Sequence, residues 1–161
     1  MIRHGELKME IPTLSEEEKQ KIFTEMWFAV IMGSRGFILQ KLGQEALEEL
    51  NDESANGCAT DMNGRGIDDA LKFAMNYAVV NKNIFGSDVV VEGTPERAVL
   101  DTKRCSNLEA ALEFAAKGMP ITKEQHCAGC IDGYFKRVAK NLGFSLDVEF
   151  SDKGCKMTIS K

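Results

Sequence analysis

The apolar positions in the N-terminal third of the chain follow the period of an amphipathic helix. Ser15-Glu16-Glu17-Glu18 is a capping box that starts this helix. Gly33 and Gly36 weaken the pattern, so we expect a kink or short break there, or a close helix crossing. A second helical run follows Gly43, whereas the polar stretch 51–66 defines no more than another turn or two of helix. The apolar residues of the first helix recur at spacings of three and four: Ile22, Phe23, Met26, Trp27, Val30 and Ile31.

The period changes in the middle of the chain. A helix is expected from residue 67 to about residue 80, with its apolar residues on one face. Segments 87–92 and 97–101 are strand-like and are joined by Gly93-Thr94-Pro95-Glu96, which predicts a β-hairpin. A further short helix follows, capped by Ser106 or Asn107 and ending at Gly118.

The C-terminal third combines one helix with a second hairpin. Thr122-Lys123-Glu124-Gln125 is a capping box, and the helix it opens is expected to end at Gly143. Apolar and polar residues then alternate in 144–150 and 155–159, as in half-buried strands. We therefore predict an α+β fold in which N-terminal helices pack with an antiparallel sheet of four or more strands and two further helices. Residues 1–14 are predicted to be a flexible leader, and residues 15–161 a single ligand-binding domain.

Composition and charge exclude several partners. The 161 residues are 43% apolar and 28% charged, with a formal net charge of −5, which suits one globular domain with a core. Lysine and arginine are interleaved with acidic residues, so no basic patch for nucleic acid is expected. The N-terminus lacks the apolar stretch of a signal peptide, and the longest apolar run, 26–33, is too short to span a bilayer. We expect a cytoplasmic protein without a membrane partner.

Five cysteines carry the candidate chemistry. An odd number in a reducing compartment favours free thiols or metal ligands over disulfides. Cys127 and Cys130 share one helical face at a spacing of three, and Cys105 and Cys155 stand where a helix and a strand begin. Zinc prefers four tetrahedral cysteine, histidine or carboxylate ligands. The candidate metal ligands are Cys105, Glu124, His126, Cys127, Cys130 and Cys155.

Other roles for the cysteines remain open at this point. Cys127 and Cys130 lie on the apolar stripe of their helix, so packing in the core is weighed equally with metal binding. A redox or nucleophilic thiol is weighed lower, because a thioredoxin-like motif would follow a strand and open its helix. Cys58, which is remote from the others in the sequence, is interpreted as incidental.

A ligand site is predicted around three residues. Arg35 interrupts an apolar helix, where it either extends its charge to solvent or binds a ligand carboxylate. Trp27 and Tyr134 are the aromatic candidates for the same pocket, although such residues also fill cores. The sequence contains no Gly-rich phosphate loop, no nucleophile elbow and no clearly positioned general base.

The layout of the cysteines resembles that of a known family. A cysteine follows the first hairpin (Cys105), a Glu-x-x-Cys follows about twenty residues later (Glu124 to Cys127), and Gly154-Cys155 enters the last strand. The turn Leu42-Gly43-Gln44-Glu45-Ala46 also fits. Over most of residues 15–160 the chain resembles the aminothiazoline-carboxylate hydrolase-like family and the related 4-vinyl-reductase-type small-molecule-binding domains.

The resemblance implies an α+β ligand-binding domain that is often dimeric. In sensor relatives zinc is held by a cysteine, a Glu-x-x-Cys pair and a further cysteine, which implies Cys105, Glu124, Cys127 and Cys155 here. The last cysteine lies further along the chain than in the sensors, and His126 and Cys130 are additional candidates.

The candidate ligands and the resemblance together lead to three candidate functions. The first is a sensor-like domain that binds a small molecule and holds structural zinc. The alternatives are a metal-dependent or thiol hydrolase of the aminothiazoline-carboxylate type and an iron–sulfur protein. The length and apolar width of helix 15–42 also predict a homodimer face.

Overall fold

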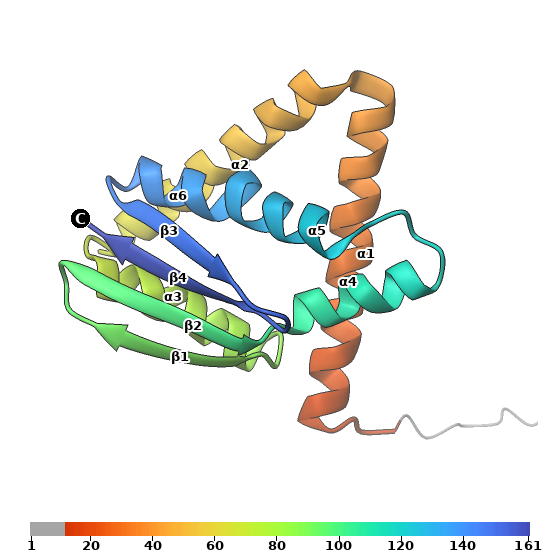
Figure 1. Cartoon of the computed structure of the whole chain (residues 1–161), viewed down its shortest axis with the longest axis horizontal. Coiled ribbons are helices and arrows are strands. Elements are labelled where there is room, and N and C mark those ends of the chain that lie inside the picture. The colour runs from red at the N-terminus through yellow and green to blue at the C-terminus, as the bar shows by residue number, and fades with distance from the viewer. Residues whose placement is uncertain (1–11) are drawn as a thin grey trace, which may run out of the picture.

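We analysed a computed structural model, which describes residues 12–161 (Figure 1). Residues 1–11, most of the predicted leader, lie outside the described part of the chain. The helices are α1 (Glu16–Leu42), α2 (Gln44–Gly64), α3 (Ala70–Asn83), α4 (Ser106–Ala116), α5 (Lys123–Cys130), the π-helix η1 (Ile131–Phe135) and α6 (Lys136–Asn141). The strands are β1 (Asp88–Gly93), β2 (Arg97–Arg104), β3 (Ser145–Phe150) and β4 (Cys155–Ser160).

The predicted α+β class is confirmed. The four strands form one antiparallel sheet in the order β1-β2-β4-β3, so the two predicted hairpins are joined through β2 and β4. In this central pairing Leu100 lies opposite Met157 and Thr102 lies opposite Cys155. Helix α3 packs against β1 and β2, and α6 packs against β3 (Figure 1).

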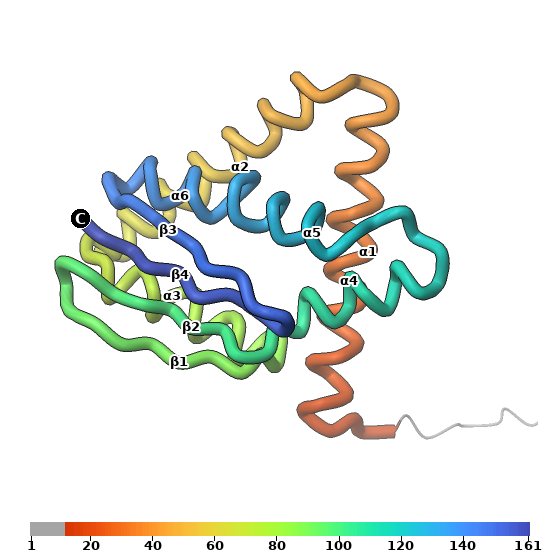
Figure 2. Tube along the Cα trace, in the orientation of Figure 1, coloured from red at the N-terminus to blue at the C-terminus, as the bar shows by residue number. Residues whose placement is uncertain are grey.

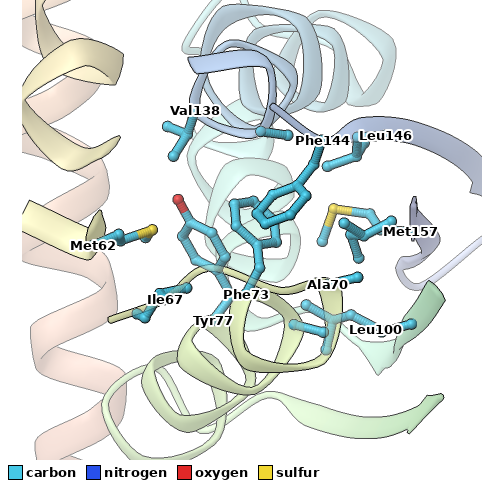
Figure 3. Packing of buried hydrophobic residues seen from close by; sticks show 14 of the residues in the cluster. Met62, Ile67, Ala70, Phe73, Tyr77, Leu100, Val138, Phe144, Leu146 and Met157 are labelled. Atoms are coloured by element: carbon cyan, nitrogen blue, oxygen red, sulfur yellow. The ribbon is translucent and has the colours of Figure 1, made fainter. Parts of the chain in front are cut away.

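The core lies between the sheet and helices α2, α3 and α6. Phe73 of α3 packs edge-on against Phe144 and Tyr77, with ring centroids 5.7 and 5.0 Å apart (Figure 3). Leu100, from β2, closes the opposite side of this cluster and is buried completely. Alternate residues of β4 face the same core because side chains of a strand alternate between its two faces. Cys155 shares that face with Met157 and Ile159.

Helix α1 corrects one prediction. It runs from Glu16 to Leu42 without a break, and a Cβ atom added at Gly33 or Gly36 would have no neighbour within 4 Å. Neither the expected short break nor a close helix crossing at these glycines is therefore present. The reason is that an isolated glycine costs only about 1 kcal/mol in a helix and does not by itself break the hydrogen-bond ladder. The capping box at Ser15 is confirmed.

Helix α2 extends through the polar stretch 51–66, for which only a turn or two was expected. The buried residues Asn51, Ala55, Ala59 and Met62 recur at spacings of four and three along it. Small and polar residues thus form the inward face of this helix, which is why a search for large apolar residues underestimated its length.

The predicted C-terminal helix follows one continuous path, seen in Figure 2, but is divided into three parts. Its capping box at Thr122 is confirmed. The backbone N–H of Lys136 donates to the carbonyl of Ile131, five residues earlier, so the middle of the helix has π geometry. Such π-turns frequently occur at functional sites.

By length and composition alone, the helical stretch Glu16–Gly64 includes a segment apolar enough to cross a membrane, and 11% of that segment is buried within the domain. One contact of α1 with the rest of the domain is made by Phe28, which packs on Phe114 of α4 with ring centroids 5.2 Å apart.

Candidate functional site

Two of the cysteines meet where β2 ends. The turn before β4 crosses β2 so closely that a Cβ atom on Gly154 would lie 1.9 Å from the carbonyl oxygen of Thr102. Only glycine permits this approach. The backbone N–H of Cys105 donates to the carbonyl oxygen of Lys153, 2.8 Å away. This turn therefore places Cys105, the residue before α4, beside Cys155, the first residue of β4.

Helix α5 brings two more thiols to the same place. Burial raises the pKa of Cys130, and the neighbouring Cys105, Cys155 and Cys127 raise it further. Burial raises the pKa of Cys155 to about 12, again with a contribution from Cys105 and Cys127. The pKa values of Cys105 and Cys127 are raised as well, chiefly by burial. Four thiols from three chain segments are thus close enough to repel one another as thiolates.

Four thiols are a suitable ligand set for a soft metal ion, but in their present arrangement they do not form a metal site. Thiolates are preferred ligands of zinc, and four would close a tetrahedral site. Within residues 12–161, however, no group of three or more histidine, cysteine, aspartate or glutamate side chains is arranged to hold a metal ion. A zinc site here therefore requires the cysteines to come closer together than they lie in this structure.

The two other predicted ligands have different surroundings. His126 packs its ring on Phe28 of α1, with centroids 5.7 Å apart, and burial lowers its pKa. Glu124 is fully exposed at the start of α5. Its own backbone N–H and the Thr122 hydroxyl lower the pKa of its carboxyl group. These positions favour Cys130 over His126 and Glu124 as the fourth ligand.

A second group of polar side chains lies along the π-helix. Arg35 donates from Nη1 to the side-chain oxygen of buried Asn51 at 2.6 Å. Its Nη2 atom would lie 3.5 Å from a Cβ added at Gly133. Burial is the main cause that lowers the pKa of Arg35. This guanidinium group therefore lies at contact distance from η1.

Two tyrosines continue this group on the other side of η1. Tyr134 donates its hydroxyl to Sγ of Cys58, 3.0 Å away. Tyr77 is only 7% exposed, and its hydroxyl has no hydrogen-bond partner among the residues that the structure describes. Burial raises the pKa of both tyrosines, their hydroxyls act on each other, and Cys130 acts electrostatically on both. Cys130 therefore lies between the thiol cluster and the tyrosine pair.

The predicted ligand residues are only partly brought together. Arg35 approaches Gly133 of η1, and Tyr134 is part of η1. Trp27 instead stacks on Phe23 and contacts Phe85, with ring centroids 6.4 Å apart in both pairs. Trp27 thus belongs to an exposed aromatic group beside the start of β1, away from the π-helix.

Sequence reasoning missed three residues of this region. Cys58 was interpreted as incidental, and Asn51 and Tyr77 were not singled out as site residues. A signal was present for two of them, because Asn51, Ala55, Cys58 and Met62 recur at spacings of four and three. That spacing places Cys58 on the inward face of α2 together with Asn51.

Two surface hollows lie elsewhere. One, of about 270 Å³, is bounded by the first half of α1, by α4 and by the loop before β1. The other, of about 530 Å³, lies between α2, α6 and the C-terminus. Neither is lined by a cysteine or by Tyr77.

The comparisons add no relative. No family model matches the chain, and no curated protein matches it. The resemblance inferred from the cysteine layout therefore stays a prediction.

Proposed function

We propose that this chain is a sensor-like, small-molecule-binding domain in which Cys105, Cys127, Cys130 and Cys155 hold a structural zinc ion. The observation that carries this proposal is the convergence of four thiols from the end of β2, from α5 and from the start of β4. These segments are distant in the sequence. A closed four-cysteine site would fasten α5 to the sheet without taking part in a reaction.

The raised pKa values of the thiols favour a role in metal binding over a role as a nucleophile. Thiolates, not thiols, attack substrates, and a reactive cysteine has a lowered pKa. Here burial and neighbouring cysteines raise the pKa of Cys127, Cys130 and Cys155. A divalent cation would reverse this effect, because it lowers the pKa of the thiols that coordinate it. The same four residues therefore suit metal binding and disfavour covalent catalysis.

The small-molecule part of the proposal rests on the tyrosine pair. A buried hydroxyl without a partner is costly, so an unsatisfied group such as Tyr77 calls for an explanation. A ligand oxygen or nitrogen that accepts this hydrogen would provide one. The surroundings are aromatic, since Tyr134 and Phe135 lie 6.2 and 4.5 Å from the Tyr77 ring. We therefore expect a small, mainly apolar molecule with one hydrogen-bonding group.

The zinc proposal is tested by metal analysis of the purified chain with matched cysteine variants. We expect about one zinc per chain, as for one four-ligand site. Cys155→Ser should lose it, whereas Cys58→Ser should retain it, because Cys58 pairs with Tyr134 outside the cluster. Cobalt substitution should give the visible absorption of thiolate coordination in the native chain and in Cys58→Ser only.

Other outcomes would replace this proposal. A chain without metal, or equal loss in Cys58→Ser and Cys155→Ser, would contradict a zinc site in the cluster. Broad visible absorption after anaerobic purification would indicate an iron–sulfur protein. Loss of a hydrolytic activity in a folded Cys127→Ser variant would indicate a metal-dependent or thiol hydrolase instead.

A further inference from the structure

The outer side of α1 is apolar and exposed. Phe23, Met26, Val30 and Phe37, here called the outward face, are 44%, 64%, 62% and 60% exposed. At 3.6 residues per turn these four residues lie within about 60° of one another around the helix. A contiguous apolar surface of this kind marks a site of contact with another protein or with a membrane.

The outward face lies opposite the side by which α1 joins the domain. The buried residues of α1 are Thr24 and Phe28, and Phe28 packs against α4 and α5, which cross α1 near its middle (Figure 1). Arg35 lies on this attached side, where it donates to Asn51 of α2. These contacts hold α1 along the domain, so a partner can approach the outward face without disturbing the fold.

The hydropathy of α1 is in the range of lipid-embedded segments. The stretch Glu16–Gly64 includes a segment apolar enough to cross a membrane, and this segment lies in α1 because α2 is rich in acidic residues. A core helix of that composition would be mostly buried, whereas only 11% of this segment is. Because Arg35 and Phe28 fasten α1 to the domain, the folded chain can place this helix along a bilayer surface but not across it.

Lysines stand near both ends of the outward face. Lys41 follows Phe37 by four residues and therefore lies on the same side of α1. Lys82 lies beside the start of α1, since the side chain of Gln20 donates to its carbonyl oxygen, 3.5 Å away. Neither lysine forms an ion pair with a residue that the structure describes. Long, flexible lysine side chains at such positions suit the phosphate groups of phospholipids.

The form of the outward face fits a bilayer better than a protein. Specific protein interfaces need complementary shapes, and the residues that line the two surface hollows include none of the outward face. A bilayer requires only apolar side chains that can enter it. Trp27 borders the face, stacks on Phe23 and is 47% exposed. Tryptophan is enriched where acyl chains meet the polar head groups.

We infer that the outward face of α1 binds the surface of a phospholipid bilayer, with α1 parallel to the membrane plane and Lys41 and Lys82 at the level of the phosphates. Interfacial helices bury their apolar face to a depth of about 5–10 Å. The inference replaces the expectation, drawn from the sequence, of a protein without a membrane partner. It is independent of the proposed zinc site and of the proposed ligand.

Flotation of the full chain with vesicles tests the contact. We expect the native chain to float with phosphatidylcholine vesicles, and Val30→Glu to bind about tenfold more weakly or less, because a charge would enter the apolar layer. The matched control is Val90→Glu, which places the same charge on an exposed valine of β1 and should float like the native chain. A circular dichroism spectrum equal to that of the native chain shows that each variant is folded.

The fluorescence of Trp27 reports which surface enters the bilayer, because this is the only tryptophan of the chain. We expect its emission to shift to shorter wavelength when phosphatidylcholine vesicles are added. Phosphatidylcholine that is brominated on its acyl chains should quench it. A chain that floats without either change would bind through another surface, which would overturn the inference.

Anionic lipid tests the two lysines. The acidic first turn, Glu16 to Glu18, opposes their attraction to phosphate, so the apolar contact should contribute most. With phosphatidylglycerol in the vesicles, Lys41→Gln/Lys82→Gln should bind roughly 25-fold more weakly than the native chain, about fivefold for each lysine. Its affinity for pure phosphatidylcholine should stay close to native. The matched control Lys153→Gln/Lys156→Gln, which removes two lysines at the start of β4, should bind both kinds of vesicle like the native chain.

Three results would reject the inference. A native chain that stays in solution as a monomer has no membrane contact. A native chain that stays in solution as a dimer, and that Val30→Glu dissociates, would assign the outward face to a second copy. Equal flotation of the native chain and Val30→Glu would show that the outward face takes no part in binding.

Discussion

The sheet with α2, α3 and α6 differs sharply from the part formed by α1, α4 and α5. We call the first the body and the second the arm. The body buries eighteen hydrophobic residues in one continuous cluster centred on Phe73. Among the described residues the arm buries four, Phe28, Leu108, Ala110 and Ala111, with a few half-buried neighbours. The body can therefore be stabilised by its own core, whereas the arm has little core of its own.

The proposed zinc site would act on the arm. A metal held by the thiol cluster would connect α5 to the ends of β2 and β4, and α1 leaves large apolar side chains such as Met26 and Val30 exposed. A thin core supplies little free energy, so such elements often rely on metals or oligomerisation. The difference between the regions thus indicates which part of the molecule depends on partners.

The largest expected difference between the body and the arm is the loss of stability when one buried phenylalanine in each is truncated. Phe73 and Phe28 are 1% and 3% exposed, so the chemistry and the burial are matched. Phe73→Ala should lower the free energy of unfolding by about 3–5 kcal/mol, as usual for a packed core. Phe28→Ala should cost less than half of that, because the sparse arm can relax around the gap. Urea denaturation measures both, and equal losses would contradict the division into body and arm.

Removing the metal should loosen the arm selectively. If zinc is bound by the native state alone, chelation should lower the free energy of unfolding by about 2–3 kcal/mol. Hydrogen exchange should accelerate in α4 and α5 and stay nearly unchanged in α3 and β2. Cys58→Ser should respond like the native chain. Uniform acceleration across the body and arm would show that the cluster does not act as a clamp between them.

Much of the fold was predictable from local sequence signals. Both capping boxes and both hairpins are where the sequence placed them, because these motifs act over a few residues. The continuity of α1 through Gly33 and the full length of α2 were not predicted. In both helices, residues with a weak preference for helix are held in the helix by the turns on either side of them. Judging each residue by its own preference therefore predicts breaks that the helices do not have.

It was predictable which cysteines could come together, but not which residues surround them. The strand and helix boundaries indicated that Cys105, Cys127 and Cys155 could meet. The contact between Tyr134 and Cys58 joins residues 76 positions apart, and no local pattern encodes it. The π-turn was likewise hidden, since an inserted residue in a helix barely disturbs a spacing of three and four.

Replacing Tyr77 tests whether the buried hydroxyl group of this residue destabilises the body. Its hydroxyl is buried without a partner. Tyr77→Phe removes that unsatisfied group and keeps the ring, so the free energy of unfolding should rise by about 1–2 kcal/mol. Thermal or urea denaturation measures the change. A loss of stability would show that the hydroxyl is satisfied in solution and would remove the main support for a ligand at this position.

The smallest expected effect is a pH dependence at the border of the two regions. Burial and the hydrogen bond to Cys58 raise the pKa of Tyr134 from 10.0 to about 12. A raised folded-state pKa contributes stability that is complete below pH 10 and is lost as the pH rises toward 12. Relative to Tyr134→Phe, the native chain should therefore lose about 0.5–1 kcal/mol by pH 11, reduced by solvent at this half-buried site. Parallel curves for the two chains between pH 8 and pH 11 would show that the Tyr134 hydroxyl is accessible to water, and that η1 opens more readily than the body beneath it.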